Sequence, residues 1–139
     1  MIILDTNVLS ELARPAPDQT VVGWLSAQPP DQMRLTVITE AELLTGIARM
    51  PAGRRKTELA NTVASVLNDE FKDRILPFDR PAAAGYAPIF AARRASGRPI
   101  SQFDCQIAAI ARANEAAVAT RNTRDFEDCG IEVINPWRR

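Results

Sequence analysis

Residues 1–12 have the sequence MIILDTNVLSEL, and this opening stretch sets the pattern for the rest of the chain. The apolar run at residues 2–4 predicts a short buried strand that ends at Asp5. Thr6 and Asn7 can cap a helix over about residues 8–13, and Pro15 stops that helix. An acidic side chain is therefore expected where the first strand ends and the first helix begins.

Strands and helices continue to alternate along the chain. Apolar or β-rich runs predict further strands over residues 33–38, 75–78, 116–120 and 132–134. Helices are expected after the capping residues Asp18, Thr39, Asp79 and Ser101, and a longer one from the break at Pro51 to about Phe71. This alternation predicts an α/β fold, with a short parallel sheet flanked by helices. No repeat or linker interrupts it, so we expect a single domain over residues 1–139.

Composition narrows the possible functions. The 139 residues carry 17 basic and 17 acidic side chains, so no overall field attracts nucleic acid, and any such binding needs local patches. Histidine is absent, which removes the commonest general base and the commonest zinc ligand. Cys105 and Cys129 fit no zinc pattern, and a reduced pair is expected. The sequence has no signal-peptide pattern or membrane-length apolar run, so we expect a cytoplasmic protein without membrane contact.

Four acidic residues are expected near the same edge of the sheet. Asp5 follows the first strand, Glu42 and Asp104 lie in first turns of predicted helices, and Asp125 follows the strand at residues 116–120. In an open α/β sheet the carboxyl ends of the strands share one rim, where ligands bind. Carboxylates brought together there repel one another unless a cation lies between them. An all-oxygen site suits Mg²⁺ or Mn²⁺, which can activate a water molecule and neutralise charge on a phosphate.

A structural explanation exists for each of these acids. The segments beginning at Thr39 and Ser101 both match a capping box, in which Glu42 or Asp104 would only stabilise a helix start. Asp5 could likewise be a helix-start residue and Asp125 a turn residue. The placement of all four on one rim favours the functional interpretation. The aromatic residues expected in the core rather than as base-stacking platforms are Trp24, Phe103, Phe126 and Trp137.

Two basic clusters could bind an RNA backbone, but for both of them a solvated helix face is the slightly favoured explanation. They consist of Arg49, Arg54, Arg55 and Lys56, and of Arg93, Arg94 and Arg98.

Five segments together resemble a known family: MIILDTNVLSEL, VITEAELLTGIAR, SQFDCQIAAIA, VATRNTRDFE and INPW. In this order they resemble the PIN-domain toxins of the VapC group, most closely the FitB-like branch, from Met1 to about Trp137. The resemblance implies a PIN-like three-layer sandwich and an endoribonuclease dependent on Mg²⁺ or Mn²⁺, with 5′-phosphate and 3′-hydroxyl products. It also implies a homodimer, inhibition by a VapB-like antitoxin, and binding of the complex to operator DNA.

The family's acidic residues fall on Asp5, Glu42 and Asp104. Its fourth acid falls either on Asn122 or on Asp125, and we choose Asp125 because an amide is a poorer metal ligand. The remaining matches are polar residues that orient ligands or bound water in the family. They are Thr6, Asn7 and Thr120, with Asn122 as an auxiliary residue.

Two rival functions remain open. Asp5 could be the covalent nucleophile of a phosphatase, although the second acid expected two residues later is Asn7, and lysines are scarce. Alternatively, the chain could be a catalytically weak PIN-like domain that binds RNA or a partner.

Overall fold

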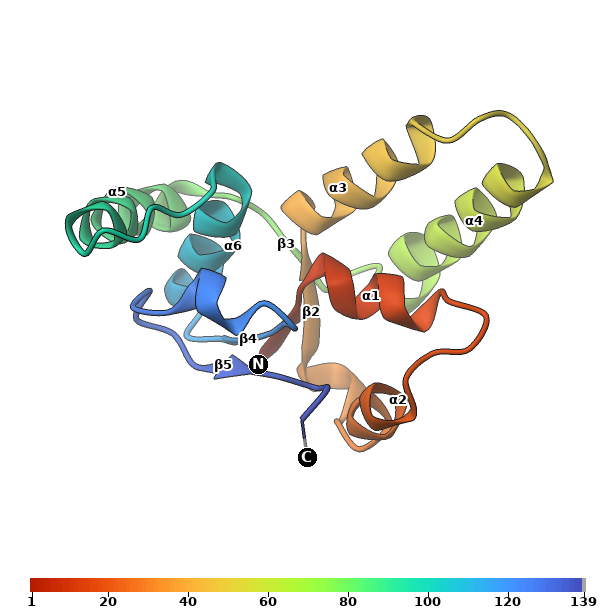
Figure 1. Ribbon diagram of the computed structural model, residues 1–139, viewed down its shortest axis with the longest axis horizontal. Helices are drawn as coiled ribbons and strands as arrows, with labels where there is room; N and C mark the ends of the chain where they lie inside the picture. Colours follow the sequence, from red (N-terminus) through yellow and green to blue (C-terminus); the bar gives the residue numbers. More distant parts are fainter. Residues whose placement is uncertain (139) are drawn as a thin grey trace.

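Five short strands form one parallel sheet in the computed structural model, which describes residues 1–138 (Figure 1). The strand order is β3-β2-β1-β4-β5, and all four pairings are parallel. The strands are β1 (Ile2–Leu4), β2 (Met33–Thr36), β3 (Ile75–Leu76), β4 (Ala117–Ala119) and β5 (Val133–Ile134). The predicted α/β fold with a short parallel sheet is confirmed. The chain runs from β1 through β2 to β3 at one edge, then crosses back to β4 beside β1 and continues to β5, so the order of strands reverses between β1 and β4.

Six helices flank this sheet within residues 1–138. They are α1 (Thr6–Leu12), α2 (Gln19–Ser26), α3 (Val37–Ala48), α4 (Arg54–Ser65), α5 (Arg80–Ala95) and α6 (Gln102–Ala113). In Figure 1, α5 and α6 lie on one side of the sheet, and α1 and α4 lie on the other. None of the helices in this part of the chain is long and apolar enough to cross a membrane.

Alternating side chains of the central strands fill two hydrophobic cores, one on each face of the sheet. Ile3 and Val118 pack with the helix α6 side, whereas Leu4 and Ala119 pack with residues of α1, α2 and α4. On α6, Ile107 and Ile110 are fully buried, and each contributes roughly 1.5–3 kcal/mol through burial. The two cores give the expected three-layer sandwich and fix the strand ends from which the candidate site is built.

Two predicted boundaries were wrong in a way that matters for the site. Strand β2 ends at Thr36, not at residue 38, and α3 begins at Val37. The Thr36 side chain caps α3 by accepting a hydrogen bond from the Thr39 backbone N–H at 3.2 Å. Thr39 therefore lies inside the helix, and Glu42 lies in its second turn. The proposed capping box starting at Thr39 does not form, so capping does not explain Glu42.

The segment expected to be one long helix to Phe71 is divided. Helix α4 ends at Ser65 and passes into a π-helical turn over Val66–Glu70. Leu67 and Phe71 are buried there against the core on the α1 side. A change in helical pitch at this point turns these side chains inward.

Candidate functional site

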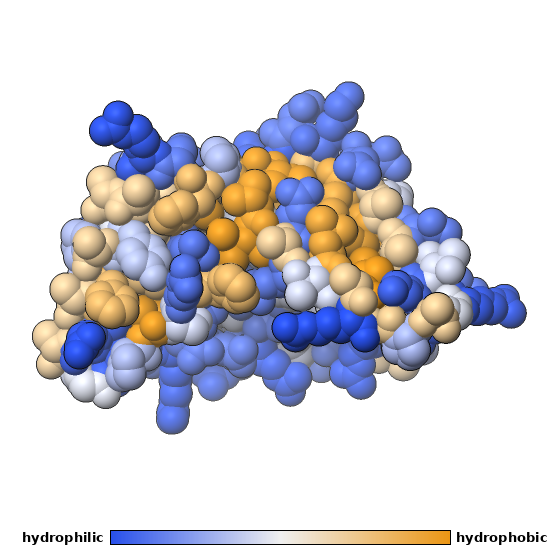
Figure 2. Space-filling view, turned by 90° about the horizontal axis from the view of Figure 1, so that it is seen from above, coloured by the Kyte–Doolittle hydropathy of each residue, from blue (hydrophilic) through white to orange (hydrophobic). Residues whose placement is uncertain are grey.

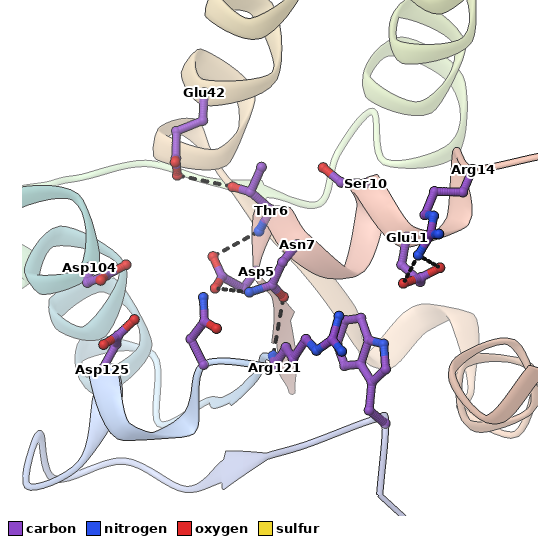
Figure 3. Close-up of a pocket in the computed structure, with 12 residues that line it drawn as sticks. Asp5, Thr6, Asn7, Ser10, Glu11, Arg14, Glu42, Asp104, Arg121 and Asp125 are labelled. Atoms are coloured by element: carbon purple, nitrogen blue, oxygen red, sulfur yellow. Dashed lines mark hydrogen bonds and ion pairs between the residues drawn. The ribbon is translucent and has the colours of Figure 1, made fainter. Parts of the chain in front are cut away.

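A cavity of about 580 Å³ opens at the carboxyl ends of β1 and β4, and we call it the acid cavity (Figure 3). The predicted acids Asp5, Glu42, Asp104 and Asp125 all line it, and they come from four separate segments. Thr6, Asn7 and Asn122 also line it, whereas Thr120 is buried beside it. The remaining lining residues are Ser10, Glu11, Arg14, Arg121 and Trp137. The topology thus brings together residues that are far apart in sequence.

Asp5 is the most enclosed acid, with 6% of its surface exposed. It caps α1, accepting a hydrogen bond from the Thr6 backbone N–H at 2.8 Å. Its other carboxylate oxygen accepts hydrogen bonds from Thr120 Oγ1 at 2.8 Å and Asn7 Nδ2 at 3.2 Å. Burial nevertheless raises the pKa of Asp5, and the nearby charge of Asp125 adds to that effect. Asp5 is therefore held in one orientation at a position that disfavours its charge.

Glu42 reaches the acid cavity from α3 and lies on the opposite side of Asp5 from Asp125 (Figure 3). Thr6 Oγ1 lies 3.0 Å from its carboxylate and donates a hydrogen bond to it. Burial raises the pKa of Glu42, and the charges of Asp5 and Asp104 raise it further, while the Thr6 bond acts in the opposite direction. Thr6 thus joins α1 to the acid on α3.

Asp104 lies in the first turn of α6, where Ser101 is the N-cap and accepts a hydrogen bond from the Asp104 backbone N–H at 3.1 Å. The predicted cap at Ser101 is confirmed, yet the Asp104 side chain also lines the acid cavity. Burial raises the pKa of Asp104, with further contributions from Asp5 and Asp125. The Ser101 hydroxyl and the Arg93 guanidinium partly oppose this rise.

Asp125 and Asn122 lie close together in the turn that follows β4. Asp125 belongs to a 3₁₀ turn over Thr123–Phe126, and the Asn122 backbone N–H donates to Thr120 Oγ1 at 3.1 Å. Phe126 is buried, as expected. The Asp125 charge acts on the pKa values of both Asp5 and Asp104, which places it among the acids. Both side chains line the acid cavity, so geometry leaves the choice of fourth acid to experiment.

The donor set suits a divalent cation that keeps part of its water shell. Three carboxyl groups have pKa values raised by burial and by one another, and a bound cation would reverse both effects. Within residues 1–138, however, no three His, Cys, Asp or Glu side chains approach closely enough to hold one ion by themselves. Mg²⁺ commonly binds through one or two carboxylates and retains several waters. These residues therefore fit such an ion.

Several residues of the acid cavity were missed from the sequence. Ser10, Glu11 and Arg14 follow the predicted Asn7 at i+3, i+4 and i+7, a helical spacing that runs along α1 and just past its end and could have revealed them. Glu11 is buried and lies 3.3 Å from Arg14 Nη1.

Trp137 was expected in the core but is only partly buried, and it also lines the acid cavity. The expectation that Phe103 lies in the core was wrong, because its side chain on α6 is 55% exposed. The Arg121 guanidinium lies over its ring, 5.3 Å from the centroid.

The two basic clusters lie outside the acid cavity. Arg93 is buried, and its guanidinium donates to the backbone carbonyls of Asp125 at 2.8 Å and Glu127 at 3.2 Å. Arg98 forms ion pairs with Glu127 and Asp128. In the other cluster Arg54 pairs with Glu58 at 2.8 Å. Arg93 and Arg98 thus make contacts within the protein, whereas Arg49, Arg55 and Arg94 are exposed.

An apolar groove of about 720 Å³ adjoins the acid cavity. It is lined by apolar side chains of three helices: Leu9 of α1, Leu43 and Ile47 of α3, and Leu59 and Val63 of α4. Figure 2 shows hydrophobic side chains gathered in the middle of the face seen from above, with hydrophilic ones around them. The groove and the acid cavity share the lining residues Thr6, Ser10, Arg14 and Glu42. A molecule lying in the groove would therefore reach the acids.

Comparison with known proteins identifies the family. The chain matches the PIN domain family model over residues 2–131. It is 44% identical over 137 residues to the VapC ribonuclease Y4jK of Sinorhizobium fredii, covering 99% of this chain and 98% of that protein. It is 42% identical over 137 residues to Toxin FitB of Neisseria gonorrhoeae, covering 99% of each. The structure of FitAB bound to an IR36 DNA fragment matches with a TM-score of 0.94 at 40% identity, covering 100% of this chain and 97% of that one. The chain belongs to the PIN-domain family and, within it, to the VapC and FitB group.

Proposed function

We propose that this protein is a metal-dependent endoribonuclease that hydrolyses RNA phosphodiester bonds and acts in the cytoplasm as the toxin of a VapBC-type toxin–antitoxin pair. The observation that carries the proposal is the convergence of Asp5, Glu42, Asp104 and Asp125 on one cavity. The 44% identity to a protein named VapC ribonuclease supports the same activity.

The four acids would hold Mg²⁺ or Mn²⁺, with Asn122 as an auxiliary ligand. The bound ion would supply Lewis-acid stabilisation of the charge that develops on the scissile phosphate. Thr120 and the Thr6 backbone orient Asp5 for this task, and the Thr6 hydroxyl orients Glu42. Asn7 donates to both Asp5 and Thr120, which links the two orienting groups.

A carboxylate of this site can also take the proton of the attacking water. Glu42 and Asp104 are the candidates for this role, because both line the acid cavity and are incompletely buried. The water oxygen would form a bond to phosphorus as the bond to the 3′ oxygen breaks. The leaving oxygen takes up a proton from solvent, which gives a 5′-phosphate and a 3′-hydroxyl.

The phosphatase alternative is less well supported. The position two residues after Asp5, where such a phosphatase is expected to carry a second acid, holds Asn7, whose amide donates to the Asp5 carboxylate. Within residues 1–138, no lysine lines the acid cavity to balance a phosphoryl group. The other alternative, a binding domain with weak catalysis, differs from our proposal only in its cleavage activity. The cleavage experiment below distinguishes the two.

The apolar groove would receive the antitoxin. A solved structure of FitAB bound to DNA supports a protein partner, and through it operator DNA. Because the groove shares Thr6, Ser10, Arg14 and Glu42 with the acid cavity, a bound antitoxin segment would block access of RNA to the acids.

RNA cleavage with controlled metal tests the proposal. The purified protein should cleave single-stranded RNA in Mg²⁺ or Mn²⁺, stop in EDTA, and recover when the metal is restored in excess. Asp104→Asn, purified in the same way, controls for contaminating nuclease and should be inactive. Equal cleavage with and without chelator would remove the metal from the mechanism, and absence of cleavage on any RNA would favour the binding-domain alternative.

A further inference from the structure

The end of the acid cavity away from Asp104 and Asp125 differs in chemistry from the rest. Five acidic side chains line the cavity, but Arg14, Arg121 and Trp137 also line it. In Figure 3, Arg121 and Arg14 lie on the other side of Asp5 and Asn7 from Asp104 and Asp125. The cavity thus combines an acidic end with an end that carries two arginines and an aromatic ring.

Local hydrogen bonds hold Trp137 in place. The Asn135 side chain accepts a hydrogen bond from the Trp137 backbone N–H at 2.9 Å, which forms a tight turn after β5. The intervening Pro136 is buried. Trp137 packs partly against the core on the α1 side. A tryptophan that only filled the core would not also line the cavity.

Arg121 packs over this ring. Its guanidinium lies over the Trp137 ring at 5.3 Å from the centroid, and its side chain is exposed. Its backbone N–H donates to Asn7 Oδ1 at 3.3 Å, which ties it to the residue that also contacts Asp5. Arg14 pairs with Glu11, but no Asp or Glu side chain within residues 1–138 forms an ion pair with Arg121.

We propose that Arg121 and Trp137 form a nucleotide subsite, in which an RNA base next to the scissile phosphate stacks on the guanidinium–indole platform. Protein sites for single-stranded RNA combine flat aromatic or guanidinium surfaces with positive charge. The acids repel the negatively charged RNA, which would be held beside them through the bound metal ion. A positively charged contact that also stacks on a base would therefore strengthen RNA binding next to the acids. This subsite rests on the proposed ribonuclease function and adds where the flanking nucleotide binds.

Tryptophan fluorescence provides a direct test, because Trp24 and Trp137 are the only tryptophans in the sequence. In a Trp24→Phe, Glu42→Gln protein, Trp137 is the sole reporter and the RNA is expected to remain intact. A short single-stranded RNA of mixed sequence, added with Mg²⁺, should quench this fluorescence, since stacking brings a base against the platform. An abasic ribose-phosphate strand of the same length should quench little.

Substitutions separate the subsite from the catalytic centre. In the otherwise unchanged protein, Arg121→Gln and Trp137→Leu should raise KM for RNA roughly tenfold or more, with a smaller change in kcat. Trp137→Phe keeps an aromatic face and should restore most of the affinity. Arg121 is exposed, so its variants test the platform even if Trp137→Leu fails to fold. Arg80→Gln, which removes an exposed arginine outside the cavity, is the matched control.

The outcomes distinguish the two proposals. RNA cleavage with normal KM in the Arg121 variants, or equal quenching by intact and abasic strands, would overturn the subsite and leave the ribonuclease proposal standing. If the wild-type protein neither binds nor cleaves RNA, both proposals fail.

Discussion

Glu42 and Asp104 are carboxyl groups whose surroundings favour the protonated form, first through burial and then through neighbouring acids. An amide keeps their shape and removes the repulsion. Glu42→Gln and Asp104→Asn should each abolish RNA cleavage, yet leave the metal-free protein at neutral pH at least as stable as the wild type. Thermal unfolding in EDTA measures this. A loss on the order of 1 kcal/mol with activity retained would instead indicate a helix-capping role.

The stability gain of these amide variants should depend on pH. A carboxyl group with a folded-state pKa above its unfolded value stabilises the fold most when it is protonated, and this contribution is lost as pH rises through the folded-state pKa. The difference in Tm from wild type should therefore be largest at neutral pH. It should shrink as pH falls through the raised pKa values toward the ordinary 3.8 of Asp and 4.5 of Glu. A difference independent of pH would contradict electrostatic repulsion as its source.

Asp5 should behave differently from the other acids because both of its carboxylate oxygens accept hydrogen bonds within the protein. Donors from Thr6, Asn7 and Thr120 point at them, and an amide can accept fewer of these bonds in either orientation. Asp5→Asn should therefore lose cleavage and also lose roughly 1 kcal/mol of stability. Chemical denaturation of Asp5→Asn beside Glu42→Gln makes the comparison, and equal stability of the two variants would show that the donors relax freely.

The fourth acid can be identified by metal titration of cleavage. A hard cation gains more from a carboxylate than from an amide, so Asp125→Asn should raise the metal concentration for half-maximal cleavage strongly. Asn122→Ala should raise it less, and Asn122→Asp should be tolerated. Because both residues are exposed, stability should change little in any of these variants. Normal cleavage by Asp125→Asn with an inactive Asn122→Ala would centre the site on Asn122.

At the level of elements, Arg93 joins α5 to the turn that carries Asp125. Its buried guanidinium donates to the carbonyls of Asp125, Glu127 and Arg98, all within 3.2 Å. Arg93→Met should leave these carbonyls without a donor and destabilise the protein by roughly 2–4 kcal/mol. It should also raise the metal requirement, because Asp125 is no longer fixed. Hydrogen exchange should show faster exchange at residues 125–129, and unchanged exchange there would refute a positioning role.

The elements also show how far the sequence could be interpreted. Local sequence patterns predicted strand β1, the order of strands and helices, and the caps at Asp18, Asp79 and Ser101. The start of α3 did not, because Thr36, Val37 and Ile38 are β-branched residues that favour a strand. The cap hydrogen bond from Thr39 to Thr36 decided the outcome instead. Glu42 was thus placed in the wrong turn, although it still reaches the cavity.

For the whole molecule, the strand order explains why the acids meet. The connection after β1 leads to β2 on one side, and the connection after β4 leads to β5 on the other, so a crevice opens at the carboxyl ends of β1 and β4. Asp5 lies at this point, α3 brings Glu42 from one side, and α6 and the turn after β4 bring Asp104 and Asp125 from the other. This convergence could be expected from an α/β pattern alone. The placement of Arg121 and Trp137 could not, because it depends on how the C-terminal turn packs.

The assembly of the whole molecule yields the last prediction. We expect a homodimer, which the family resemblance implied. Leu44 of α3, Phe90 of α5 and Phe103 of α6 are 40–55% exposed, and α6 packs against both other helices. Large exposed apolar side chains on adjoining helices favour association, and aromatic residues often dominate such interfaces. Sedimentation at micromolar concentration should therefore show a dimer.

Substitution at these aromatics locates the interface. Phe103→Ser and Phe90→Ser should each weaken self-association about tenfold, because each removes apolar surface that the dimer would bury. The fold should persist, since both side chains lie largely outside the core. Gln19→Ser, an exposed change on α2, should have no effect and serves as the control. A wild-type monomer at micromolar concentration would contradict the dimer itself. A dimer that both serine variants leave intact would place the interface on another face. The apolar groove would then be the next surface to test, because apolar side chains of α1, α3 and α4 line it.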